Sequence, residues 1–124
     1  AVCHGPEHSA SDNEDNLMLF NREDALKRIG GNEELLQKVF DIFLEKTPET
    51  MEKLREGIDN NNMKEIAFHA HSMKGPCGSI GAESCLKLFA ELERIARDNK
   101  TDQVRAVFEN ADHELMRLME KIKE

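Results

Sequence analysis

Apolar residues recur every three or four positions along most of this chain of 124 residues. Four such stripes run through residues 33–58, 63–80, 82–98 and 101–121, and polar turns separate them. This spacing places the apolar side chains on one face of an α-helix. The expected inward positions are Leu36, Val39, Phe40, Phe43, Thr50 or Met51, Leu54 and Ile58; Ile66, Ala70, Met73, Cys77 and Ile80; Leu86, Phe89, Leu92 and Ile95; and Val104, Val107 or Phe108, Ala111, Leu115, Leu118 and Ile122. The pattern predicts an all-α protein, an antiparallel up-and-down four-helix bundle.

A shorter helix is predicted ahead of the bundle, over residues 22–29. Asn21 is suited to its start, because a side-chain oxygen there can accept a hydrogen bond from a free backbone N–H. Gly30 and Gly31 are suited to end it. We expect this helix to cap the bundle at its N-terminal end.

The ends of the longer helices are also marked in the sequence. Asn32 and Asn62 are expected to cap the second and third helices, and Gly81 to end the third. Pro48 lies inside the stripe at residues 33–58. Because proline lacks a backbone N–H and clashes with the preceding turn, we expect it to kink that helix or to split it at Thr47.

The chain divides into two parts by composition. Residues 1–16 are polar, contain glycine, proline and serine, and have no helical period. We interpret them as a disordered tail or linker left after excision from a longer polypeptide, although a processed or tagged chain fits equally well. Residues 17–124 are expected to form one domain, with a core of aliphatic residues and phenylalanine since tryptophan and tyrosine are absent.

Composition excludes several function classes. The net charge of −8 argues against nucleic acid, which is bound through clustered Lys and Arg. Three cysteines without a C-x-x-C pair indicate neither a disulfide framework nor a zinc knuckle, and they fit a reduced, cytoplasmic compartment. No apolar run approaches the roughly 20 residues that span a bilayer, and the N-terminus lacks the order of a signal peptide. We therefore expect no direct membrane contact, although a parent protein could be anchored.

The candidate chemistry lies in the third helix. His71 and Lys74 are about 60° apart around the helix and about 4.5 Å apart along it, so the ammonium can reach a group bonded to the imidazole. Gly75 leaves the imidazole uncovered. Because the apolar stripe faces the core, these residues face outward together with Phe68 and Gly78. An exposed imidazole beside a cation suits the transient carrying of an anionic group such as phosphoryl.

The run Ala70-His71-Ser72-Met73-Lys74-Gly75, followed by Gly78, Ser79 and Gly81, resembles the signature of histidine-containing phosphotransfer (HPt) domains of bacterial phosphorelays and hybrid sensor histidine kinases. The resemblance extends over residues 19–122. It includes Phe20-Asn21, Ala25-Leu26, Gly30-Gly31, Leu35-Leu36, Phe43 and Pro48 upstream, and Leu86, Leu88, Glu91, Leu92 and Glu93 downstream. Pro76 departs from the family pattern, in which a helix-compatible residue is usual, and it is expected to bend the helix beyond the site.

The resemblance implies a function and its residues. His71 would accept a phosphoryl group on its distal ring nitrogen from one receiver domain and pass it to another, with Lys74 offsetting the phosphoryl charge. Receiver domains of response regulators or of a hybrid kinase would be the partners and would supply Mg²⁺, so we expect no cofactor of the chain's own. Glu93 is expected near the site, and Phe68, Gly75, Gly78 and Glu93 are candidate docking residues. We expect a monomer.

Other functions remain open. A helical adaptor in which His71 is never phosphorylated is the main alternative, although it would have no need of the His-Lys-Gly set. The chain has no Gly-rich phosphate loop, H-E-x-x-H or Ser-His-Asp arrangement, so it has nothing with which to bind ATP. It could still be the terminal domain of a hybrid sensor kinase.

The remaining histidines give no metal site. His4 and His8 lie near Cys3, but such residues in a tail seldom bind a metal specifically. A di-iron bundle needs glutamate three positions before a histidine, and no histidine of the expected helices has one. His69 is about 200° around the helix from His71, so the two rings cannot share a metal or a proton, and we expect His69 at the edge of the core.

Overall fold

The structure is a computed structural model that describes residues 20–123. Helices make up nearly all of this range: α2 (Arg22–Arg28), α3 (Glu33–Asp59), α4 (Met63–Ser79), α5 (Glu83–Arg97) and α6 (Thr101–Lys123). The expected tail at residues 1–16 and the Cys3, His4 and His8 group lie outside the described residues. Within them, no helix is both long and apolar enough to cross a bilayer.

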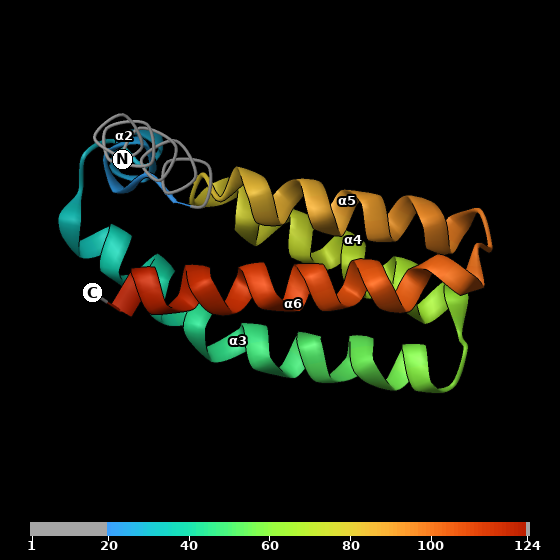
Figure 1. The fold of residues 1–124 in the computed structure, drawn as a ribbon. Helices are drawn as coiled ribbons and strands as arrows, with labels where there is room; N and C mark the ends of the chain where they lie inside the picture. The colour runs from blue at the N-terminus through green and yellow to red at the C-terminus, as the bar shows by residue number, and fades with distance from the viewer. Residues whose placement is uncertain (1–19, 124) are drawn as a thin grey trace, which may run out of the picture.

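Helices α3 to α6 lie side by side along their lengths, and consecutive helices run in opposite directions (Figure 1). The short helix α2 lies at one end of this bundle, near the turn that joins α4 to α5. The predicted four-helix bundle with a short N-terminal capping helix is therefore confirmed. Because helices that follow one another in sequence are also neighbours in space, short turns suffice to connect them.

The predicted inward stripes form the core. Most of the expected positions are buried, and Val39, Leu86, Val107 and Ile122 are partly buried. The sequence left two pairs of alternatives for inward positions, and of these Met51 and Phe108 are the buried residues. The buried face of α5 includes Cys85, one position before the expected Leu86, and α5 packs against both α4 and α6. Cys77 and Cys85 are buried and unbridged.

Asparagine side chains fix three helix starts as predicted. Asn21, Asn32 and Asn62 accept hydrogen bonds from the backbone N–H groups three residues later, at 3.2, 3.1 and 3.2 Å. Each bond satisfies one of the donors that a helix start leaves free.

Pro48 does not split its helix, so that part of the prediction is wrong. α3 is continuous from Glu33 to Asp59, although its first turns run at an angle to the rest (Figure 1). Phe43, Thr47 and Met51 are buried on both sides of the proline, and this packing outweighs the one backbone hydrogen bond that it removes. α4 likewise continues through Pro76 to Ser79.

The turn after α4 is held by α2. Gly81 has a φ of +74°, which allows the Ala82 N–H to donate to the Cys77 carbonyl at 2.8 Å. The Arg28 guanidinium donates to the Gly78 carbonyl at 3.1 Å and to Asp24 at 2.8 Å. These contacts satisfy a carbonyl at the end of α4 and fix the connection between α4 and α5, the two helices that carry the candidate site.

Candidate functional site

His71 lies in the middle of α4 on the side that faces away from the core. Its side chain is 64% exposed, whereas Ala70 and Met73 on either side of it are buried. The apolar stripe of α4 fixes the rotation of the helix, and this rotation places the imidazole outward. The sequence prediction of an exposed ring at this position agrees with the structure.

A buried carboxylate lies beneath the imidazole. Glu93 of α5 is only 10% exposed, and its Oε2 lies 3.0 Å from the Nδ1 of His71. Lys74 Nζ donates to the other oxygen, Oε1, at 2.9 Å. Arg97, one turn further along α5, donates to Oε2 from Nε at 3.0 Å and from Nη2 at 2.7 Å. The site is thus a four-residue cluster built by two packed helices.

Glu93 is ionised in this environment. Burial by itself would raise the pKa of Glu93, but the hydrogen bonds from Lys74, Arg97 and His71 outweigh it and hold that pKa at about 2. An ionised carboxylate can only accept hydrogen bonds. The Nδ1 of His71 must therefore carry the proton, which leaves the lone pair on Nε2. The cluster holds one imidazole tautomer and directs its nucleophilic nitrogen away from Glu93.

Lys74 has a partner that spacing along one helix could not indicate. That spacing predicted an ammonium within reach of a group bonded to the imidazole, and in the structure the ammonium is paired with Glu93 across the helix interface. Its side chain is still 34% exposed. The ammonium is thus close to the site but already has a partner.

Glu93 was expected near the site and also as a docking residue, and only the first placement fits the structure. A side chain that is 10% exposed offers little surface to a partner. Its contacts are with His71, Lys74 and Arg97, so it acts inside the domain.

Arg97 was missed by the sequence analysis. A glutamate followed four positions later by an arginine forms a pair on one helix face, and this spacing was the available signal. What the sequence could not indicate was that the glutamate of this pair also reaches His71 and Lys74 on the neighbouring helix.

The other residues of the outward face differ in exposure. Phe68 is 64% exposed and packs edge-on against His69, with ring centroids 5.1 Å apart. A Cβ atom added at Gly75 would meet nothing within 4 Å. Gly78 is half-buried, and its carbonyl accepts from Arg28 of α2, so its surroundings belong partly to the capping helix.

His69 lies at the core edge, as expected. Its side chain is 12% exposed, and its Nε2 lies 3.1 Å from Glu65 Oε2. Its hydrogen bond and its ring contact are with Glu65 and Phe68, outside the cluster around His71. Among residues 20–123, no group of three or more His, Cys, Asp or Glu side chains is arranged to hold a metal ion.

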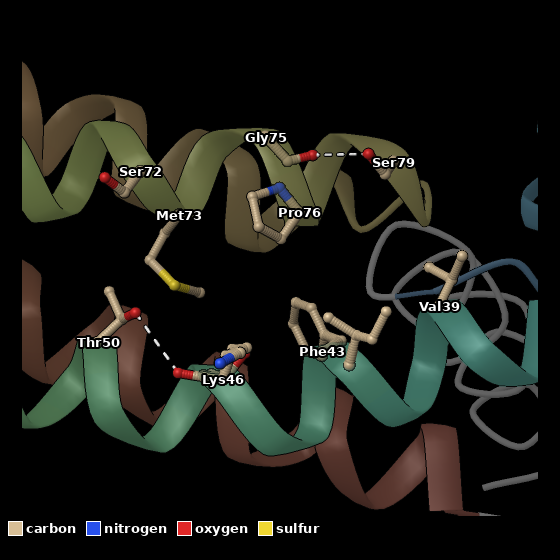
Figure 2. A pocket seen from close by; sticks show the side chains of 11 residues that line it. Val39, Phe43, Lys46, Thr50, Ser72, Met73, Gly75, Pro76 and Ser79 are labelled. Carbon is tan, nitrogen blue, oxygen red and sulfur yellow. Dashed lines mark hydrogen bonds between the residues drawn. The ribbon is translucent and has the colours of Figure 1, made fainter.

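A groove of about 490 Å³ runs between α3 and α4 beside this face (Figure 2). Gly75 and Pro76 line it from α4, and Met73 and Phe43 point into it from opposite sides. Ile42 of α3, which is 58% exposed, extends its apolar lining. Gly75 therefore borders both the groove and the surface around His71, one helical turn away.

Comparison with known proteins identifies the family. The family model described as Hpt domain matches residues 38–124. The HPt domain of a Shewanella hybrid histidine kinase has a TM-score of 0.77 and 18% identity, covering 86% of this chain and 92% of that one. Histidine-containing phosphotransfer protein B of Pseudomonas aeruginosa has a TM-score of 0.79 and 20% identity, covering 85% and 91%. No curated protein matches the chain.

The chain belongs to the Hpt domain family, because the family model matches more than half of its length. Its function is histidine phosphotransfer in a two-component phosphorelay, and receiver domains are its class of partner. The adaptor alternative is not favoured.

Proposed function

We propose that His71 is the phosphoacceptor and that its Nε2 carries the phosphoryl group between the aspartates of two receiver domains. The observation that supports this most strongly is the contact between Nδ1 and the ionised Glu93 carboxylate at 3.0 Å. A transfer nucleophile needs a neutral nitrogen with a free lone pair, held in one orientation. His71 combines this tautomer with exposure to a partner.

The reaction follows from that tautomer. The Nε2 lone pair attacks the phosphorus of an aspartyl phosphate, the bond from phosphorus to the carboxylate oxygen breaks, and its electron pair leaves with the aspartate. The ring proton stays on Nδ1, so the phosphorylated ring carries a positive charge that Glu93 balances. In the second transfer the ring leaves as neutral imidazole. The contact between Nδ1 and Glu93 thus supports phosphoryl transfer both to His71 and from it.

Lys74 would offset charge on the phosphoryl oxygens during transfer. The proposed partner supplies the rest of the active site, namely the acceptor or donor aspartate and the Mg²⁺ bound in its acidic pocket. This chain would need no cofactor of its own. Both a free-standing carrier and the terminal domain of a hybrid kinase would use this chemistry, and we propose that it operates as a monomer in the cytoplasm.

The proposed docking surface surrounds His71. Phe68 and Gly75 lie about one turn on either side of it along α4, and the apolar groove against α3 adjoins Gly75. Exposed apolar residues beside a reactive group are typical of an interaction site. A receiver resting there would bring its aspartate over the imidazole.

A panel of phosphorylated receiver domains tests the proposed function. The domain is mixed with each receiver carrying radioactive aspartyl phosphate, and transferred label is followed by its lability in acid and stability in base. At least one receiver is expected to label the domain on His71. Label that withstands acid, or that maps to a residue other than His71, would contradict the proposal.

Replacing Lys74 by alanine is expected to slow transfer roughly tenfold without preventing receiver binding, because its proposed role is local and electrostatic. Lys64→Ala is the matched control, since Lys64 is an exposed lysine of α4 about two turns from His71. Transfer rates are measured by rapid quench, and binding by titration. Indistinguishable rates for the two variants would exclude a specific role for Lys74.

Replacing Gly75 by leucine is expected to lower receiver-dependent phosphorylation at least tenfold while the fold stays intact. Open space surrounds this position, and exchanging an interior glycine for leucine favours the helix by up to about 1 kcal/mol. The new side chain would obstruct the approach to His71. Labelling of the Gly75→Leu variant by a small phosphodonor should change little. The receiver-dependent phosphorylation rate of Gly75→Ala should lie between those of the unmodified domain and Gly75→Leu. A stable variant with normal transfer would show that docking does not cross this turn.

A further inference from the structure

The two oxygens of Glu93 have unequal partners. Oε2 lies within hydrogen-bond distance of Nδ1 of His71 and of two nitrogens of Arg97. Among the hydrogen bonds of the described residues, Oε1 receives one, from Lys74. Lys74 can therefore leave Glu93 without disturbing the bond that fixes the imidazole.

The two cations are also attached to the site in different ways. Arg97 is on α5, four residues after Glu93, and both of its donating nitrogens converge on the same oxygen. Lys74 is on α4, three residues after His71 and on the same helix face. A flexible lysine side chain on the helix of the phosphoacceptor can follow a group bonded to it, whereas the arginine stays with the carboxylate on its own helix.

Phosphorylation would change the competition for Lys74. In the unphosphorylated domain the site contains one carboxylate and two cations beside the imidazole. A phosphoryl group on Nε2 adds a stronger negative charge on the exposed side of the ring. If Lys74 were the only cation on Glu93, its departure during transfer would leave the buried carboxylate with the imidazole alone, before the ring has gained its full positive charge, and a poorly paired buried carboxylate is costly. Arg97 removes that cost.

We propose that Arg97 is a positioning residue that neutralises Glu93 so that Lys74 can exchange from Oε1 to the phosphoryl oxygens. This inference rests on the proposed function of His71 and assigns a part of it to a residue that does not touch the phosphoryl group. Without Arg97, Glu93 retains Lys74, and transfer proceeds as though the lysine were absent.

A double-mutant cycle on transfer rate tests the exchange. The probe is a phosphorylated receiver domain that labels the unmodified protein, and the proteins compared are the unmodified domain, Lys74→Ala, Arg97→Gln and the double variant. Lys74→Ala is expected to be roughly tenfold slower and Arg97→Gln three- to tenfold slower, with the double variant no slower than Lys74→Ala. Arg97→Lys should restore most of the rate, because it returns the charge.

Two further measurements separate this role from a general structural one. Arg94→Gln is the matched control, since Arg94 is an exposed arginine of α5 that pairs with Glu91 and Asp98, and it should transfer normally. Nitrogen NMR of His71 in unphosphorylated Arg97→Gln should still show the proton on Nδ1, because Lys74 keeps Glu93 ionised.

Four results would overturn the inference. Additive slowing in the double variant would mean that Arg97 acts on the phosphoryl group or the receiver independently of Lys74. An unchanged rate in Arg97→Gln would remove its role, and a lost Nδ1 proton would mean that it serves His71 through Glu93 alone. Absence of acid-labile label on His71 in the unmodified domain would overturn the proposed function as well, and this failure is recognised before any variant is compared.

Discussion

His71→Gln is expected to abolish acid-labile labelling by every receiver that labels the unmodified domain. The amide of glutamine is not a nucleophile towards phosphorus, so no slower route through the same position remains. Because the imidazole is largely exposed, the substitution should change the free energy of unfolding by less than about 1 kcal/mol. Label transfer and a urea unfolding curve on the same preparation provide the two measurements.

His69→Gln is the control for this experiment. His69 is on the same helix two positions away, but it contacts Glu65 and Phe68 at the core edge. Its replacement should retain labelling, with some loss of stability from the changed packing. Labelling that survives in His71→Gln and disappears in His69→Gln would show that the phosphoacceptor is His69 and not His71.

Glu93→Gln is expected to lower the transfer rate by at least roughly 100-fold, the lower end of the range of about 10²- to 10⁴-fold seen when a positioned proton-transfer or tautomer-setting group is removed. A neutral amide can present either its oxygen or its NH₂ to Nδ1, so neither imidazole tautomer is enforced. It also no longer balances the charge of the phosphorylated ring. Receiver binding should change much less than transfer, because the Glu93 side chain is only 10% exposed and offers a receiver little surface. Equal losses of binding and transfer would instead make Glu93 a docking residue.

The same substitution should flatten the acid dependence of stability. The pKa of Glu93 is lowered from 4.5 to about 2 in the folded domain. A carboxyl with a lowered folded-state pKa contributes stability that is present above its unfolded pKa and lost as pH falls through its folded pKa. The unmodified domain should therefore lose on the order of 2 kcal/mol from this group between about pH 5 and pH 2.

Urea unfolding at pH 7 and pH 3 checks this expectation. The difference in unfolding free energy between the unmodified domain and Glu93→Gln should shrink at pH 3, because the carboxyl is then mostly protonated in the unfolded state but still mostly ionised in the folded state. Glu91→Gln, at an exposed position of the same helix, should show little such dependence. A difference that stays constant with pH would mean that Glu93 is not held ionised by its three partners.

The fold could be predicted because its determinants are local. The stripes of apolar residues determine which side of each helix is buried. The side chains of Asn21, Asn32 and Asn62 mark helix starts, because each accepts a hydrogen bond from the backbone N–H three residues later. Of the two effects predicted for Pro48, a kink or a split, the split does not occur. The local cost of the proline was predictable, but the tertiary packing that keeps α3 continuous was not.

For the site, helical spacing could predict only the relative positions of residues on the same helix. Helical spacing placed His71, Lys74 and Gly75 on one exposed face, whereas the proximity of Glu93 came from the family resemblance. The pairing of Lys74 with Glu93 depends on how α5 is rotated about its axis and shifted along it relative to α4. The same packing decides whether the Glu93 that Arg97 contacts also reaches His71. The groove between α3 and α4 was likewise hidden, because it requires two facing helices. None of these relations has a fixed separation in sequence.

Nitrogen and phosphorus NMR of the phosphorylated domain, with its histidines labelled with ¹⁵N, tests the central claim most directly. It identifies which histidine is phosphorylated and which ring nitrogen bears the phosphorus. The account predicts one phosphohistidine, at His71, with phosphorus bonded to Nε2 and a proton retained on Nδ1 against Glu93. Phosphorus on Nδ1 of His71, or on any other histidine, would contradict it.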